Sequence, residues 1–125
     1  MLSVSLIFSS CSAFASKEEM LISETWYRKY NDYYWGASSY DIPHCDVIRF
    51  YSNGDVLLNT YVYYNGKWRK DYKGESNWEL LDNDVLVYRG THYDWGIGWE
   101  VNEHNLAIGK NNPVIYTHDN PGIDN

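Results

Sequence analysis

The stretch Asp46-Val-Ile-Arg-Phe-Tyr51, followed by Ser52-Asn53-Gly54-Asp55 and Val56-Leu-Leu-Asn-Thr-Tyr-Val-Tyr-Tyr64, decides the fold class. Apolar residues alternate along the first segment, with Ile48 and Phe50 on one face, and the even positions of the last segment are its more apolar set. A period of two is the signature of a half-buried strand. Asn-Gly supplies the positive φ angles that a tight hairpin turn needs. The stretch therefore predicts a β-hairpin over residues 46–64.

Similar short segments lie on both sides of this hairpin. We expect a helical turn at 17–22, a long loop at 31–43, and further strands at Thr25–Tyr30, Glu75–Leu81, Val85–Arg89, Ile97–Val101, Leu106–Ile108 and Val114–His118. Eight short strands with almost no helix are typical of a barrel or sandwich, and consecutive hairpins favour a meander. The sequence predicts an all-β fold, a small antiparallel up-and-down β-barrel of about eight strands. The alternation predicts an inward set of Ile48, Phe50, Val56, Leu58, Trp78, Leu80, Trp99, Leu106 and Ile108.

The first fifteen residues carry no Lys, Arg, Asp or Glu and end at Ala13-Phe14-Ala15. An apolar run before a small-residue site is the pattern of a secretory signal. Ser9-Ser10-Cys11 also resembles a bacterial lipoprotein box, in which Cys11 is lipidated and becomes the first mature residue. A lipoprotein signal, simple secretion and an uncleaved segment all remain open. We expect residues 1–15 to be the signal and 16–125 a single β-barrel domain, exported to the periplasm, anchored in the outer membrane or secreted.

The composition limits the classes of partner. The formal net charge is −7 with a pI near 4.9, which disfavours nucleic acid because phosphate backbones are repelled. Contact with a membrane is expected only through a lipid anchor. The basic group at residues 67–73 is interrupted by Trp68 and Asp71 and predicts a loop. Once Cys11 is lipidated or removed, Cys45 lacks a disulfide partner, so we expect a buried thiol or an intermolecular partner.

Several motifs occur in one order along the chain: Trp26, then Ile48–Gly54, then Asn77-Trp78-Glu79-Leu80, then Leu106-Ala107-Ile108. This order resembles small bacterial lipocalin-like (calycin-type) domains over residues 23–118. The resemblance implies an antiparallel barrel whose open mouth holds an apolar or amphipathic ligand, with Arg89 as the candidate for the family's late basic residue. An eight-stranded barrel holds one small ligand or is filled by side chains.

No catalytic motif is present. Asp82 and Asp84 flank a turn and are not held as the carboxylate pair that a glycosidase needs, and no residue lies in a recognisable nucleophile motif. His92-Tyr93-Asp94, completed by His104 or His118, would be a weak metal half-site without the spacing of a zinc motif. We expect no enzyme activity, no cofactor and no metal.

Aromatic residues are abundant, with 13 Tyr, 6 Trp and 3 Phe. Trp35, Trp68 and Trp95 fall in or beside predicted loops, where Tyr and Trp serve as binding anchors. The candidate ligand-binding residues are Trp35, Trp68, Trp95, Tyr64, Tyr88 and Trp99. The sequence thus favours a non-enzymatic binding module of the cell envelope or secretome, with a small apolar or amphipathic ligand in the barrel mouth. The alternative is a filled barrel whose exposed Tyr and Trp loops bind a protein or carbohydrate partner.

Overall fold

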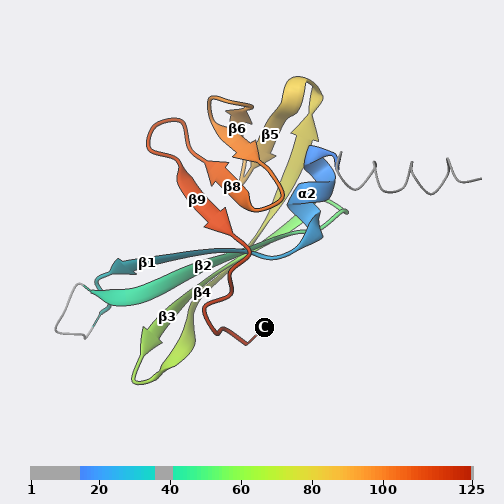
Figure 1. Ribbon diagram of the computed structural model, residues 1–125. Helices are drawn as coiled ribbons and strands as arrows, with labels where there is room; N and C mark the ends of the chain where they lie inside the picture. The colour runs from blue at the N-terminus through green and yellow to red at the C-terminus, as the bar shows by residue number, and fades with distance from the viewer. Residues whose placement is uncertain (1–14, 36–40, 125) are drawn as a thin grey trace, which may run out of the picture.

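The computed structural model describes residues 15–35 and 41–124 and places nine strands in one sheet. The prediction of an all-β, antiparallel up-and-down barrel is confirmed: the strand order is β6-β5-β4-β3-β2-β1-β9-β8-β7, and the edge strands β6 and β7 meet at a bridge between Trp95 and Trp99, so the barrel is nearly closed (Figure 1). The candidate lipidation residue Cys11 lies outside the described residues. The elements are α2 (Lys17–Ser23), β1 (Trp26–Asp32), β2 (Ile42–Phe50), β3 (Asp55–Tyr64), β4 (Lys67–Leu81), the 3-10 turn η1 (Asp82–Asp84), β5 (Val85–Tyr88), β6 (Thr91–Asp94), β7 (Trp99–Val101), β8 (Asn105–Ile108) and β9 (Val114–Thr117).

Four sequence predictions about these elements were wrong. The segment 67–73 is not a loop but the first half of β4, because the Asn65-Gly66 turn reverses the chain directly into it. The loop expected at 31–43 is shorter, since β1 and β2 remain paired up to Asp32 and Ile42. Ile97 is an exposed turn residue rather than the start of a strand. Strand β6 was missed because Arg89-Gly90, with φ of 52° and 77°, makes a hairpin turn without the usual Asn or Asp.

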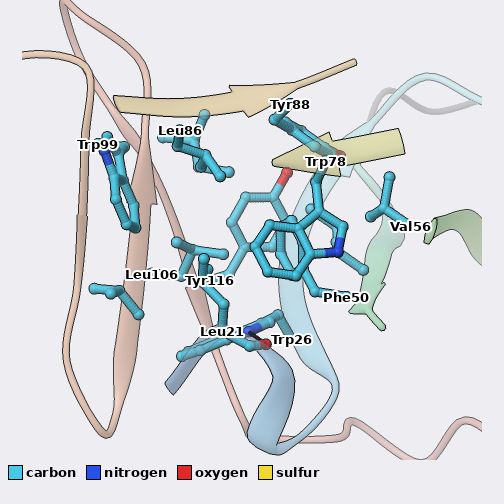
Figure 2. Close-up of a cluster of buried hydrophobic side chains, with 13 residues drawn as sticks. Leu21, Trp26, Phe50, Val56, Trp78, Leu86, Tyr88, Trp99, Leu106 and Tyr116 are labelled. Carbon is cyan, nitrogen blue, oxygen red and sulfur yellow. Dashed lines mark hydrogen bonds between the residues drawn. The ribbon is translucent and has the colours of Figure 1, made fainter. Parts of the chain in front are cut away.

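The barrel interior is packed with large side chains (Figure 2). Seven of the nine residues predicted to point inward are buried in one cluster, and the other two, Leu58 and Leu80, are half-buried against it. Phe50 lies between the rings of Trp78 and Tyr88, with ring centroids 5.5 Å and 5.6 Å away. The period-two register of the sequence is therefore confirmed, and aromatic rings occupy the barrel centre.

Tryptophan side chains tie the barrel to the segments around it. The indole N–H of Trp26 donates to the Leu21 carbonyl of α2 at 3.0 Å, and that of Trp99 donates to the Asp84 carbonyl at 2.8 Å. Ser16 caps α2 through a reciprocal capping box with Glu19, and this helix places Leu21 in the core. These bonds satisfy the polar edge of each buried indole and fix α2 over one end of the barrel.

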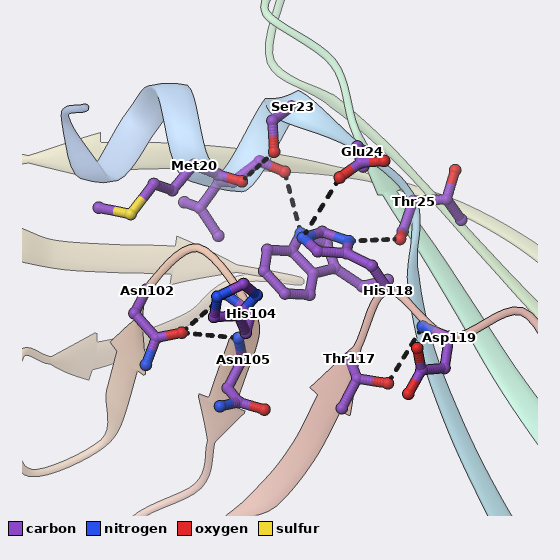
Figure 3. Close-up of polar contacts among 12 residues, drawn as sticks. Met20, Ser23, Glu24, Thr25, Asn102, His104, Asn105, Thr117, His118 and Asp119 are labelled. Carbon is purple, nitrogen blue, oxygen red and sulfur yellow. Dashed lines mark hydrogen bonds and ion pairs between the residues drawn. The ribbon is translucent and has the colours of Figure 1, made fainter. Parts of the chain in front are cut away.

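His118 fastens the end of β9 to the start of β1 (Figure 3). Its Nδ1 lies 2.9 Å from the Thr25 carbonyl, so this nitrogen must carry the proton and donate. The imidazole ring packs 3.9 Å from the Trp26 ring, and its Nε2 lies 4.0 Å from the Glu24 carboxylate. These contacts reinforce the short pairing between the adjacent strands β1 and β9 beside α2.

Strands β1–β4 continue beyond the barrel as a twisted sheet, with the C-terminal tail beside it (Figure 1). We call the face of this sheet that carries Ile48 and Phe50 the inner face, and the opposite one the outer face. The tail covers part of the outer face, where Ile123 packs with Tyr27, Cys45, Val47 and Tyr61. The expectation of a buried Cys45 thiol is confirmed. Across residues 15–35 and 41–124, helices are too short or too polar to cross a bilayer.

Candidate functional site

The inner face changes from apolar to polar where the sheet leaves the barrel. Cross-strand pairing sets Arg28 beside Asp46 and Asp46 beside Thr60. The Asp46 Oδ1 accepts hydrogen bonds from the Tyr30 hydroxyl at 3.1 Å and the Thr60 hydroxyl at 2.9 Å, and its Oδ2 lies 3.7 Å from the Arg28 guanidinium. Three β-strands thus hold one carboxylate in a fixed position, which is the preorganisation that a recognition site requires.

Aromatic rings lie next to this carboxylate on the side that faces away from the barrel. The Tyr30 ring has the Arg28 guanidinium 4.4 Å from its centroid and the His44 ring stacked 5.3 Å away. His44 is buried and its Nδ1 donates to the Ile42 carbonyl at 2.8 Å. Tyr34 packs edge-on against both His44 and Tyr64. This part of the inner face is therefore a covered aromatic cluster that supports the network.

Tyr72 lies on the other side of the network and is the cross-strand partner of Thr60 in the pairing of β3 and β4. A Cβ atom at Gly74 would lie 2.8 Å from the Tyr72 Cε2, 2.9 Å from its hydroxyl and 3.2 Å from its Cζ, so the ring edge that bears the hydroxyl lies against the glycine. Its side chain is nevertheless half exposed, at 50 %. A register shift between Thr60 and Tyr61 marks a bulge here, and bulges re-aim side chains. The Tyr72 ring can occupy this position because residue 74 has no side chain, and we call this exposed ring the Tyr72 platform.

A hollow of about 190 Å³ adjoins this platform, lined by Val56, Leu58, Tyr72, Gly74, Glu75, Ser76, Tyr88 and Arg89. Strand β5 begins after η1, whose Asp84 is ion-paired with Lys17 of α2, and it ends at Tyr88. Tyr88 and Arg89 therefore lie at the barrel end away from α2. We call this end, with its hollow and the Asp46 network beside it, the barrel mouth.

The phenols at the mouth remain protonated. Burial raises the pKa of Tyr88 to about 12, although the neighbouring Arg89 guanidinium partly opposes the shift. Burial also raises the pKa of Tyr116 and Tyr30 well above the ordinary value, and in both cases the negative charge of Asp46 adds to the effect. At neutral pH these three groups are hydrogen-bond donors, not phenolates.

The six residues predicted to bind ligand lie in different parts of the structure. Tyr88 and Trp99 are buried in the core cluster, although Tyr88 also lines the mouth hollow. Tyr64 lies on the distal inner face against Tyr34. Trp35 is 87 % exposed. The last two are held by contacts, Trp68 on the outer face through a 3.2 Å hydrogen bond to the Pro121 carbonyl and Trp95 by packing against Trp99 and Lys17.

Sequence reasoning missed most of the mouth, namely Arg28, Tyr30, Asp46, Thr60 and Tyr72. A signal was present, because polar residues occupy even positions directly beyond the apolar even positions of the same strands. Combining those positions requires the register of three strand pairs, which one sequence does not supply.

Other regions offer less organised chemistry. A hollow of about 570 Å³ borders the β2–β3 turn, with Asn53, Asp55, Glu75 and Asn77 among its lining residues. Its polar side chains pair within the turn, as Asn53 does with Asp55, or along one strand, as Lys73 does with Glu75. Within the described part of the chain, His, Cys, Asp and Glu side chains do not gather in groups of three or more that could hold a metal ion. The mouth is the better candidate because a fixed polar network adjoins an open aromatic surface.

Comparison of the chain with protein-family models, with curated proteins and with solved structures gives no significant match.

Proposed function

We propose that the protein is a non-enzymatic binding module that holds a small amphipathic ligand at the barrel mouth. The observation that carries the proposal is the position of the Asp46 network beside the Tyr72 platform. Such a surface offers an apolar contact beside directional hydrogen bonds, since Thr60 of the network is the cross-strand partner of Tyr72. Pockets of this kind, apolar with a few fixed polar groups, are the usual form of ligand sites.

The mouth fits this role better than the barrel centre. Phe50, Trp78, Trp99 and Leu106 occupy the interior, so a ligand would contact the rim rather than enter deeply. Binding at the rim would be a shallower version of the lipocalin-type arrangement, in which the barrel mouth holds the ligand. Its setting in the cell envelope or secretome, with or without a lipid on Cys11, is part of the same proposal.

A second candidate function is supported by Trp35. At 87 % exposure this side chain leaves a large apolar surface in water, and exposed Trp residues are favoured anchors for protein partners. In that case Trp35, rather than the mouth, would make the main contact with a protein.

The amphipathic dye 8-anilinonaphthalene-1-sulfonate tests the mouth. We expect the folded parent to enhance the fluorescence of the dye, and Tyr72→Ala to weaken dye binding about tenfold because the platform is lost. Gly74→Ala should weaken it as well, since the added Cβ displaces the Tyr72 ring. The matched control is Tyr63→Ala, which removes a similarly exposed ring (41 %) from the outer face. Equal binding by all four proteins, or no binding to the parent, would contradict the proposal.

A further inference from the structure

We propose that the ligand at the barrel mouth is a saccharide that carries a carboxylate, an oligosaccharide containing uronate units, with one sugar ring stacked on Tyr72 and its carboxylate bound by Arg89. This inference rests on the proposed function and names the class of ligand for the same site.

Tyr72 offers an open ring surface to a ligand. The Tyr30 ring is flanked by Arg28 and His44, so its faces are occupied. Tyr72 instead has its hydroxyl-bearing edge toward Gly74 and half of its surface in solvent. The face of an aromatic ring is electron-rich and attracts the positive edge of a partner. The polarised C–H groups on one side of a sugar ring provide such an edge, and they form a flat apolar surface that matches a phenol ring.

The charge of the inner face differs from that of the whole chain. The whole chain is acidic, with a net charge of −7, yet the register places Arg28, Lys67 and Arg69 on the inner face with only Asp32 and Asp46. Arg89 adds a further cation at the mouth. Basic groups gathered on one face of an acidic protein favour an anionic ligand there.

Arg89 differs from the other arginines of this face in its partners. Arg28 is paired with Asp46, and the Arg69 Nε donates to the Tyr64 carbonyl. Among residues 15–35 and 41–124, Arg89 has no carboxylate within ion-pair distance. Glu75 also lines the hollow, but its carboxylate lies 3.7 Å from the Lys73 ammonium. A guanidinium without an anionic partner can bind a carboxylate through two parallel hydrogen bonds.

The remaining polar groups suit sugar hydroxyls. The Tyr88 phenol is held protonated at the edge of the hollow, and Ser76 adds a hydroxyl. At about 190 Å³ the hollow is smaller than the pockets of drug-sized ligands, which begin near about 300 Å³. It therefore suits one sugar ring, with further units lying along the inner face toward Asp46.

Titration calorimetry with two matched panels tests the inference. One panel contains uronate oligosaccharides from pectin, alginate and hyaluronan, and the other contains neutral oligosaccharides of the same length. The proteins are the parent, Tyr72→Ala, Arg89→Gln and the outer-face control Tyr63→Ala, each checked for folding by thermal melting. We expect at least one uronate oligosaccharide to bind the parent more tightly than its neutral counterpart.

The variants should separate the two contacts. Arg89→Gln should weaken uronate binding about tenfold and leave neutral binding unchanged, whereas Tyr72→Ala should weaken both. Tyr63→Ala should match the parent. Equal affinity for both panels, or no uronate binding by the parent, would overturn the inference. If dye binding still depended on Tyr72 in that case, the proposed function would stand without the saccharide.

Discussion

Replacing Phe50 with alanine tests whether side chains fill the barrel interior, which is the reason for placing the ligand at the mouth. The Phe50 side chain is 0 % exposed and contacts two large rings, those of Trp78 and Tyr88. Truncating a buried Phe costs about 3–5 kcal/mol of unfolding free energy. Loss of two aromatic pairs, each worth about 0.5–1.5 kcal/mol beyond burial, places the expected value in the upper half of that range. The rigid neighbouring rings also prevent the cavity from collapsing.

Urea denaturation followed by tryptophan fluorescence measures this loss. The neighbouring Tyr51→Ala is the control, because Tyr51 is 43 % exposed and contributes only its carbonyl to the Trp78 indole. We expect the control to change the unfolding free energy by less than about 1 kcal/mol. A loss below about 1 kcal/mol for Phe50→Ala itself would refute the inward register and the filled barrel.

Three further predictions concern the loops, the buried acids and the N-terminus. Trp35→Ala should leave the unfolding free energy within about 0.5 kcal/mol of the parent, since an exposed ring loses little burial; a large drop in melting temperature would show that Trp35 is part of the core. Burial raises the pKa of Cys45 to about 11 and that of Tyr88 to about 12, so the folded state holds these protons more tightly than the unfolded state. Stability from these groups is complete below about pH 9 and falls as the pH rises toward 11–12; a urea midpoint that increased over this range would contradict the assignment. Mass spectrometry of protein expressed in a bacterial host should find a lipidated start at Cys11 or an unmodified start at Ser16, and an intact first residue on folded, exported protein would exclude both.

The strands with strict alternation could be predicted from the sequence. Ile48, Phe50 and Val56 follow a period of two around an Asn-Gly turn, and the structure buries all three. Local chemistry determines such a hairpin, so one sequence is enough. Strand β6 could not be found in this way, because Arg89 adopts a positive φ that its residue type rarely predicts.

The site was harder to predict because its residues are far apart in the chain. Asp46 meets Tyr30 and Thr60 through strand pairing, at separations of 16 and 14 residues. The Tyr72 platform depends on the missing side chain of Gly74 and on a bulge in the pairing of β3 with β4. The composition showed that aromatic residues are unusually abundant. Only the strand register distinguishes the buried Trp99 from the half-exposed Tyr72.

The central claim is that the ligand binds on the inner face at the barrel mouth. Nuclear magnetic resonance of the ¹⁵N-labelled parent, titrated with 8-anilinonaphthalene-1-sulfonate, tests it residue by residue. We predict that the largest amide shifts fall on Thr60, Tyr72 and Arg89, while Tyr61 and Ile123 on the outer face do not move. Shifts centred on the outer face, or spread evenly over both faces, would contradict the claim.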